Sequence, residues 1–119
     1  MDGPLTRLEN GGVVYRVAAV SLVAGHLLGV RARNRERFYC PGGQLEEGET
    51  AVEALIRELR EETQWSGGLG ATCLLGRVTA SADGRPTGWT VVMDCFLVDL
   101  PFSMVPSGEI AEVRRIEWS

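Results

Sequence analysis

The chain has 119 residues, which is enough for one domain with its own core but not for two. Hydrophobic residues make up 45% of the chain and charged residues 24%, as is ordinary for a soluble globular protein. The net charge of −4 argues against a surface for duplex nucleic acid. No apolar run approaches the roughly 20 residues that span a bilayer, so no membrane partner is expected.

The amino terminus lacks the basic and apolar regions of a signal peptide. The three cysteines, Cys40, Cys73 and Cys95, are widely spaced and form no CxxC pair, which argues against a disulfide framework or a zinc site. We therefore expect a cytoplasmic protein with reduced thiols.

The first elements in chain order are extended. Residues Val13–Ala24 are rich in β-branched and small apolar residues and predict a strand buried on both faces. A turn at Gly25–His26 leads to a returning strand at Leu27–Arg33. A short extended piece at Phe38–Cys40 then enters a Pro-Gly-Gly turn at Pro41–Gly43.

The clearest helix is predicted from Thr50 to about Thr63. Thr50 and Glu53 form a T-x-x-E capping box at its start. A helical period places the apolar residues on one stripe. These residues are Val52, Leu55, Ile56 and Leu59.

The other two sides of this helix are polar. Glu58, Glu61 and Glu62 share one face, and Ala51 and Ala54 are expected on the same face, where small residues leave room above the carboxylates. Arg57 and Arg60 are expected towards solvent. Grouped carboxylates repel one another unless a cation lies among them, and oxygen-bound Mg²⁺ usually indicates phosphate chemistry.

Three more strands follow, at Cys73–Ala80, Gly88–Asp99 and Val113–Trp118. Strands on either side of one strong helix predict an α/β fold with a mixed sheet and helical cover. Little chain follows the last strand, so one face of the sheet is expected to lack a C-terminal helix or to be covered by a partner. Such a face would favour a homodimer.

The region from Gly43 to Trp65 resembles the Nudix box, G-x5-E-x7-R-E-U-x-E-E-x-G-U, where U is a bulky aliphatic residue. The matching residues are Gly43, Glu49, Arg57, Glu58, Leu59, Glu61 and Glu62. Trp65 takes the last U position, and Gln64 replaces the usual glycine. The chain is thus similar to MutT-like Nudix hydrolases, which implies a single domain over residues 1–119 with an α/β/α sandwich and a mixed β-sheet.

The resemblance implies Mg²⁺- or Mn²⁺-dependent hydrolysis of a nucleoside diphosphate linked to another group. It assigns metal binding to the Gly42 carbonyl and to Glu58, Glu61 and Glu62. Glu58 would also orient the attacking water. Arg57 is expected to orient a neighbouring carboxylate such as Glu49, which would brace the junction of loop and helix.

Residues outside the box are assigned to further roles. The resemblance places a general base in a later loop, where Glu109 and Glu112 are the candidates, against the alternative of exposed carboxylates. Arg31 and Arg33 are candidates for phosphate contact, against the alternative of surface arginines.

An aromatic residue, Trp89, Phe38 or Tyr39, could stack on a base, although strand aromatics are more often core residues. The usual glycine allows a tight helix exit, sometimes with positive φ, which Gln64 can reach at a cost of about 1 kcal/mol. We expect the helix exit to differ and the metal site to be kept.

Several functions fit these features. A short MutT-like chain favours a nucleoside triphosphate, including an oxidised one, as the nucleotide substrate. ADP-ribose or a nucleotide sugar is the alternative substrate, because all these enzymes share the box. The same residues would also fit a non-catalytic nucleotide-binding module, or an unrelated domain whose acidic helix is only solvated.

Overall fold

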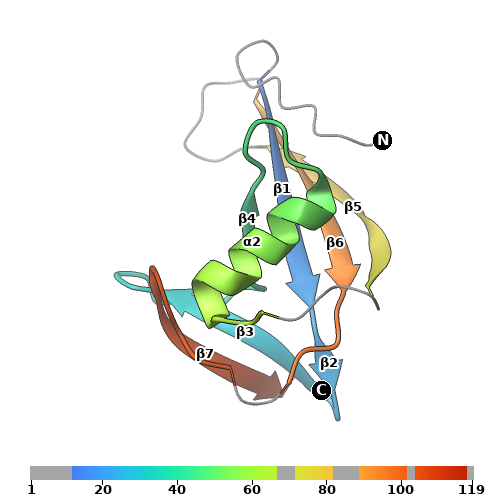
Figure 1. Ribbon diagram of the computed structural model, residues 1–119. Helices are drawn as coiled ribbons and strands as arrows, with labels where there is room; N and C mark the ends of the chain where they lie inside the picture. The colour runs from blue at the N-terminus through green and yellow to red at the C-terminus, as the bar shows by residue number, and fades with distance from the viewer. Residues whose placement is uncertain (1–11, 67–71, 82–88, 102–103, 118–119) are drawn as a thin grey trace.

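The computed structural model describes residues 12–66, 72–81, 89–101 and 104–117, which form two β-sheets and one helix (Figure 1). The first sheet has the strand order β4-β1-β6-β5 and the second has the order β2-β3-β7. The first sheet consists of β1 (Val13–Val20), β4 (Gly42–Gln44), β5 (Cys73–Ser81) and β6 (Thr90–Leu97). The second consists of β2 (Leu22–Val23), β3 (His26–Ala32) and β7 (Ile110–Glu117), and the helix is α2 (Ala51–Thr63).

The first sheet is mixed, which confirms the predicted α/β class. β1 runs parallel to β6, whereas β4 and β5 are antiparallel to their neighbours. Helix α2 crosses in front of β1 and β4 (Figure 1). Among the described residues α2 is the one helix, so a second helical layer of the expected sandwich is not observed there. No helix in this part of the chain is long and apolar enough to cross a membrane.

The prediction of one strand over Val13–Ala24 is wrong, because the chain changes sheets at Ser21. β1 ends at Val20, and β2 then pairs with β3 in the second sheet. The Ser21 side chain is fully buried, and its hydroxyl accepts hydrogen bonds from Leu100 N–H (3.3 Å) and the Arg115 guanidinium (3.1 Å). This buried polar residue therefore marks the break in the apolar run.

The other predicted strands are present with small shifts at their ends. β3 begins at His26, because the turn is formed by Ala24 and Gly25 with φ angles of 51° and 78°. The extended piece at Phe38–Cys40 pairs with β3 through a bridge between Tyr39 and Val30. β7 begins three residues earlier than expected, and Trp118 lies outside the described residues.

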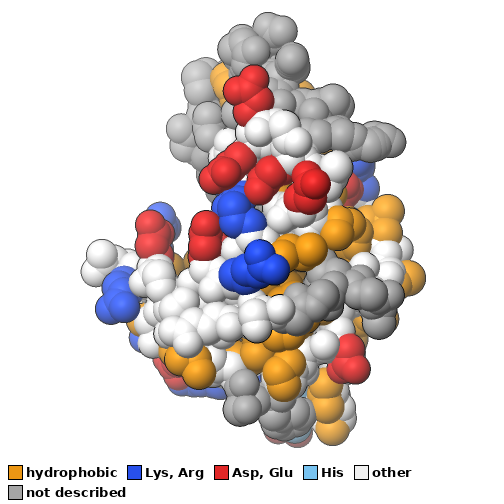
Figure 2. All heavy atoms as spheres, viewed as in Figure 1, with side chains coloured by type: hydrophobic (Ala, Val, Ile, Leu, Met, Phe, Trp, Pro, Cys, Tyr) orange, Lys and Arg blue, Asp and Glu red, His pale blue; other side chains and the backbone are white. Residues whose placement is uncertain are grey.

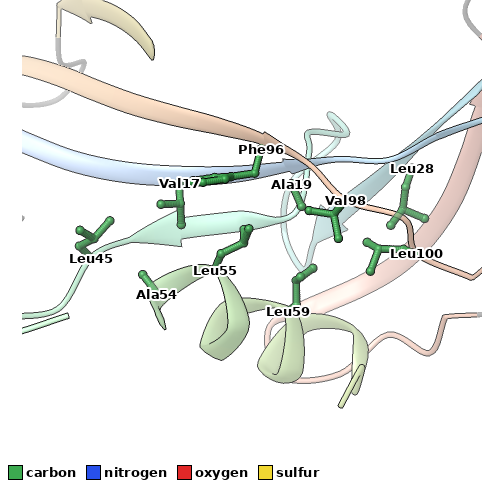
Figure 3. Close-up of a cluster of buried hydrophobic side chains, with 10 residues drawn as sticks. All are labelled: Val17, Ala19, Leu28, Leu45, Ala54, Leu55, Leu59, Phe96, Val98 and Leu100. Atoms are coloured by element: carbon green, nitrogen blue, oxygen red, sulfur yellow. The ribbon is translucent and has the colours of Figure 1, made fainter. Parts of the chain in front are cut away.

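The hydrophobic core lies between α2 and the sheets. Leu55 and Leu59 point from α2 towards Val17 of β1 and Phe96 of β6 (Figure 3). Both leucines are completely buried, so truncation of either to alanine should cost about 2–5 kcal/mol. The core thereby fixes the rotation of α2 about its own axis.

That rotation differs from the predicted one. Ala54 is completely buried in the core rather than open above the carboxylates, and Val52 is 39% exposed rather than part of the apolar stripe. The stripe that faces the sheet runs through Ala51, Ala54, Leu55 and Leu59. Glu58 and Glu62 consequently lie at the margin of the buried face, where they are partly shielded from water.

The predicted capping box at the start of α2 is confirmed, whereas the expected difference at its exit is not found. The Thr50 hydroxyl accepts from Glu53 N–H at 3.1 Å, and the Glu53 carboxylate accepts from Thr50 N–H at 3.0 Å. Gln64 ends the helix with φ 60° and ψ 15°, in the left-handed region, and its N–H donates to the Arg60 carbonyl. Gln64 thus adopts the conformation for which glycine is preferred.

Candidate active site

Arg57 organises the start of the site. Its guanidinium donates to both carboxylate oxygens of Glu49, at 2.6 and 2.9 Å, and to Glu58 at 2.9 Å. It also donates to the Gln44 carbonyl at 3.1 Å, which ties β4 to α2. The prediction that Arg57 faces solvent is therefore wrong, since its side chain is only 23% exposed. The predicted pair with Glu49 is present.

The Arg57 pair explains the electrostatics of Glu49. The hydrogen bond from Arg57 lowers the pKa of Glu49, and the Glu46 N–H, which donates at 2.8 Å, lowers it further. The same pairing with Glu49 raises the pKa of Arg57 above its already high value. Both members of this ion pair are consequently charged throughout the neutral pH range.

Glu58 and Glu62 lie one helical turn apart and form a crowded carboxyl pair. The Gly42 N–H donates to Glu62 at 3.1 Å. Burial and then the neighbouring Glu58 raise the pKa of Glu62 to about 8. Burial also raises the pKa of Glu58, despite the opposing effect of Arg57. Two half-buried carboxylates this close repel each other when both are ionised, and a bound cation would relieve that repulsion.

Glycine is required at two positions of the adjoining turn. A Cβ atom on Gly43 would collide with the Glu58 carboxylate, and one on Gly42 would collide with the Val17 carbonyl of β1. In the antiparallel ladder of β4 and β1, the backbone N–H and C=O of Gly43 point towards β1, and those of Gly42 point away from it. The Gly42 N–H accordingly reaches Glu62, and its carbonyl points to the same side of the strand.

A cavity of about 310 Å³, here called the acidic pocket, is lined by Glu58, Glu61, Glu62, Gly108 and Glu109. Acidic side chains gather over α2 and the segment before it, with basic groups between them (Figure 2). Across the described part of the chain, no three His, Cys, Asp or Glu side chains form a ready metal cluster. The Glu61 carboxylate lies 3.5 Å from the Arg57 guanidinium.

The donor set of the acidic pocket nevertheless fits a hard divalent cation. Glu58 and Glu62 supply paired carboxylates, Gly42 supplies a nearby backbone carbonyl, and Glu61 reaches the same cavity. Oxygen ligands of this kind suit Mg²⁺ or Mn²⁺. The raised pKa of Glu62 fits as well, because an added positive charge would favour its ionised form.

Of the two candidate loop bases, the structure brings only Glu109 to the acidic pocket. Glu112 instead accepts hydrogen bonds from Arg31 (3.2 Å) and Arg114 (2.6 Å). Hydrogen bonding with Arg114 and then with Arg31 holds the pKa of Glu112 below its ordinary value. A carboxylate so engaged is a poor proton acceptor.

The segment that carries Glu109 is attached to the end of α2. Ser107 N–H donates to the Glu62 carbonyl at 3.0 Å, and the Ser107 hydroxyl donates to the Glu61 carbonyl. Gly108 packs so closely on the Glu61 carbonyl that a Cβ atom there would lie 2.9 Å from its oxygen. These contacts set the position of Glu109 relative to the helix.

Arg31 and Arg33 have different surroundings. Arg33 lines a second cavity, of about 610 Å³, here called the arginine cleft. Arg31 is not among its lining residues, because it binds Glu112 and donates to the Arg35 carbonyl at 2.9 Å. The lining residues are Arg16, Ala32, Arg33, Asn34, Arg35, Arg37, Tyr39 and Glu109. Sequence reasoning missed Arg16, Arg35 and Arg37.

Tyr39 separates the arginine cleft from a third, mainly apolar cavity of about 220 Å³, here called the apolar slot. The lining residues of the slot are Arg16, Val17, Ala18, Val20, Tyr39, Cys40, Gly42, Met93 and Cys95. Tyr39 is 41% exposed, so its ring is open to a ligand. Of the other two aromatic candidates, Phe38 lies under Arg114 (4.7 Å to the ring centroid), and Trp89 packs near Gly12.

An α/β fold with carboxylates beside a glycine turn defines a class of metal-dependent phosphoanhydride enzymes. Residues 13–119 match the sequence profile of the NUDIX domain. The chain belongs to the Nudix hydrolase family, whose members are pyrophosphohydrolases with nucleotide-type substrates and typically depend on a divalent metal.

Solved structures agree on the fold. A MutT protein from Methanosarcina mazei has a TM-score of 0.72 at 22% identity, with 91% of this chain and 79% of that chain covered. The Escherichia coli dihydroneopterin triphosphate pyrophosphohydrolase has a TM-score of 0.69 at 19% identity, and the match covers 89% of this chain and 80% of that chain. A bifunctional NMN adenylyltransferase/ADP ribose pyrophosphatase from Francisella tularensis, solved with AMP and a Mn ion, has 0.68 at 23% identity. The match covers 89% of this chain but only 34% of that longer one.

Proposed function

We propose that this chain is a Mg²⁺- or Mn²⁺-dependent enzyme that hydrolyses a nucleoside triphosphate, including one with an oxidised base. The observation that carries the proposal is the half-buried carboxyl pair of Glu58 and Glu62, which shares its pocket with Glu109. This arrangement puts candidate metal ligands and a candidate base around one space large enough for a pyrophosphate group.

The bound metal would neutralise pyrophosphate charge and lower the pKa of a water molecule. Glu58, Glu62 and the Gly42 carbonyl would hold it, with Glu61 as a further ligand. The water oxygen forms a new bond to phosphorus, and the P–O bond to the bridging oxygen breaks. The bridging oxygen leaves with the bonding electron pair, and Glu109 accepts the proton that the water loses.

Arg57 and Glu49 act in this scheme as positioning residues. Arg57 holds Glu58 at 2.9 Å while Glu49 holds Arg57 from the other side. The two-bond pair with Glu49 orients the Arg57 guanidinium, whose remaining hydrogen bond then positions one oxygen of Glu58. The Glu58 carboxylate is therefore oriented towards the pocket before substrate binds.

The apolar slot is the proposed place of the nucleobase. It adjoins the turn that contains Gly42, whose N–H binds Glu62, so it lies next to the proposed metal ligands. Tyr39 offers a partly exposed ring for stacking, and Met93 and Cys95 offer an apolar wall. A base in the slot would leave the phosphates directed towards the acidic pocket.

The test is a panel of nucleoside triphosphates, oxidised triphosphates, ADP-ribose and nucleotide sugars, assayed for phosphate and pyrophosphate release with Mg²⁺ and Mn²⁺. We expect metal-dependent turnover of at least one triphosphate. Glu58→Gln should lower kcat by about a thousandfold, or ~4 kcal/mol in the barrier. Glu47→Gln is the matched control, because Glu47 is exposed and does not line the acidic pocket.

Full activity in Glu58→Gln would overturn the assignment of the metal site. Preferred turnover of ADP-ribose would favour the alternative substrate class, which is part of the name of the Francisella relative. Nucleotide binding without turnover of any panel member would favour a non-catalytic module.

A further inference from the structure

The arginine cleft is strongly positive, and the acidic side chains that line it do not balance its charge. Four guanidinium groups line it, from Arg16, Arg33, Arg35 and Arg37, whereas Glu109 is its one acidic lining residue. The side chains of Arg35 and Arg37 are exposed and make no hydrogen bond or ion pair within the described residues. Exposed guanidinium groups gathered around one hollow are suited to a multiply charged anion.

The local backbone directs these side chains into one cleft. Arg33, Asn34, Arg35 and Arg37 all line the cleft, whereas Glu36 between them does not. Asn34 has a φ of 69°, and Arg35 N–H donates to the Ala32 carbonyl at 3.1 Å, which closes a turn. Arg31 stabilises the same turn through the Arg35 carbonyl.

The cleft begins where the acidic pocket ends. Arg33 N–H donates to the Glu109 carbonyl at 2.9 Å, and Glu109 lines both cavities. The Arg33 side chain also approaches the Gly108 carbonyl, at 3.4 Å. A phosphate chain whose reacting bond lies in the acidic pocket can therefore extend past Glu109 into the cleft without leaving the protein surface.

We propose that Arg35 and Arg37, with Arg33 and Arg16, form a subsite for a phosphorylated group beyond the reacting bond. This inference rests on the proposed function for the place of that bond. It makes these arginines the determinants that select nucleotides with an anionic distal group over those with a neutral distal sugar. The residues Arg35 and Arg37 act in recognition and take no part in bond breaking.

The first experiment measures binding without turnover. Inorganic tripolyphosphate is titrated calorimetrically into the metal-free protein in EDTA, for wild type, Arg35→Gln, Arg37→Gln and the double variant. We expect each single change to weaken binding about fivefold to tenfold and the double change to weaken it at least thirtyfold. Arg60→Gln is the matched control, since Arg60 is an exposed arginine of α2 outside the cleft, and its affinity should stay within twofold.

The second experiment measures selectivity with matched pairs that share a base and a diphosphate. These pairs are ATP with ADP-ribose, GTP with GDP-mannose, and UTP with UDP-glucose. Wild type should have the higher kcat/KM for the triphosphate of its preferred base. The double variant should lose at least tenfold of that preference, through KM, while hydrolysis of the sugar nucleotide remains within twofold.

Unchanged tripolyphosphate affinity in the double variant would overturn the subsite, as would an unchanged preference or a wild-type preference for the sugar nucleotide. Absence of any turnover in wild type would contradict the proposed function instead. The calorimetric result would then still decide whether the cleft binds a polyphosphate.

Discussion

The acidic pocket and the arginine cleft meet at Glu109, but their side chains are held in different ways. In the acidic pocket, Glu58 is bonded to Arg57 and Glu62 to Gly42 N–H. In the cleft, the side chains of Arg35 and Arg37 are exposed and have no hydrogen-bond or ion-pair partner within the described ranges. A fixed set of groups suits bond breaking, whereas loosely held arginines can adapt to different anions.

This difference predicts that conservative substitutions lower activity most when they are made in the acidic pocket. Arg57→Lys keeps the positive charge but loses the fork that joins Glu49 and Glu58. We expect kcat to fall up to about a hundredfold, with little change in KM, because Glu58 is no longer fixed. Steady-state kinetics would measure this. A wild-type kcat in Arg57→Lys would show that catalysis does not depend on Arg57 holding Glu58 in place.

A second prediction concerns the close approach at Gly43. Gly43→Ala places a methyl group against the Glu58 carboxylate. The carboxylate must move, so we expect kcat to fall by about ten- to thirtyfold with the fold retained. Gly25→Ala is a control for the loss of a glycine, since nothing lies within 4 Å of its Cβ position, although its φ of +78° adds backbone strain. A circular dichroism spectrum and melting curve would establish folding in both variants.

A third prediction uses pH to separate the two regions. The pKa of Glu62 is about 8 in the folded protein, against 4.5 ordinarily, so the folded state holds a proton that the unfolded state releases between these values. Stability should therefore fall as pH rises from 4.5 to 8. Without metal, Glu62→Gln should raise the free energy of unfolding by about 2–4 kcal/mol at pH 8, where the lower figure allows for the partial exposure of Glu62, and by under about 1 kcal/mol at pH 5.

Urea unfolding in EDTA at the two pH values would measure this effect. Mg²⁺ should stabilise wild type at pH 8 more than it stabilises Glu62→Gln, since the variant lacks one ligand. Arg37→Gln is the comparison from the cleft, and it should keep the pH dependence of wild type in this window. Equal pH dependence in wild type and Glu62→Gln would contradict the assigned origin of the effect.

The smallest expected effect lies outside both cavities, at the end of α2. Gln64 has a φ of 60°, so Gln64→Gly should remove strain and stabilise the protein by up to about 1 kcal/mol. Activity should be unchanged, because the proposed metal ligands keep their positions. A melting curve with parallel kinetics would measure both, and a loss of activity would show that the helix exit shapes the pocket.

The acidic pocket could be predicted from sequence because most of its residues are local. Glu58, Glu61 and Glu62 are set by helical spacing, and Gly42 and Gly43 by the turn before it. The helix rotation could not be predicted as well, because the helical period alone places Val52 on the apolar stripe and Ala54 on the acidic face. Packing of Leu55 and Leu59 against the sheet decided it.

The arginine cleft was not predicted because it assembles from separate segments. Arg16 comes from β1, the other arginines from the end of β3, and Glu109 from the segment before β7. Their meeting depends on two sheets whose division at Ser21 was not foreseen. Two signals were nevertheless present: one arginine inside the apolar run of β1, and the alternating arginines of residues 33–37.

The attachment of Ser107 and Gly108 to the last turn of α2 has a consequence for how such a protein can diversify. These contacts join the segment that carries Glu109 directly to the turn of α2 that carries Glu61 and Glu62. The turn at residues 33–37 joins this segment mainly through Arg33. If residues 33–37 select the substrate as proposed, changes in this turn would alter substrate choice without disturbing the contacts that hold Glu109 to α2.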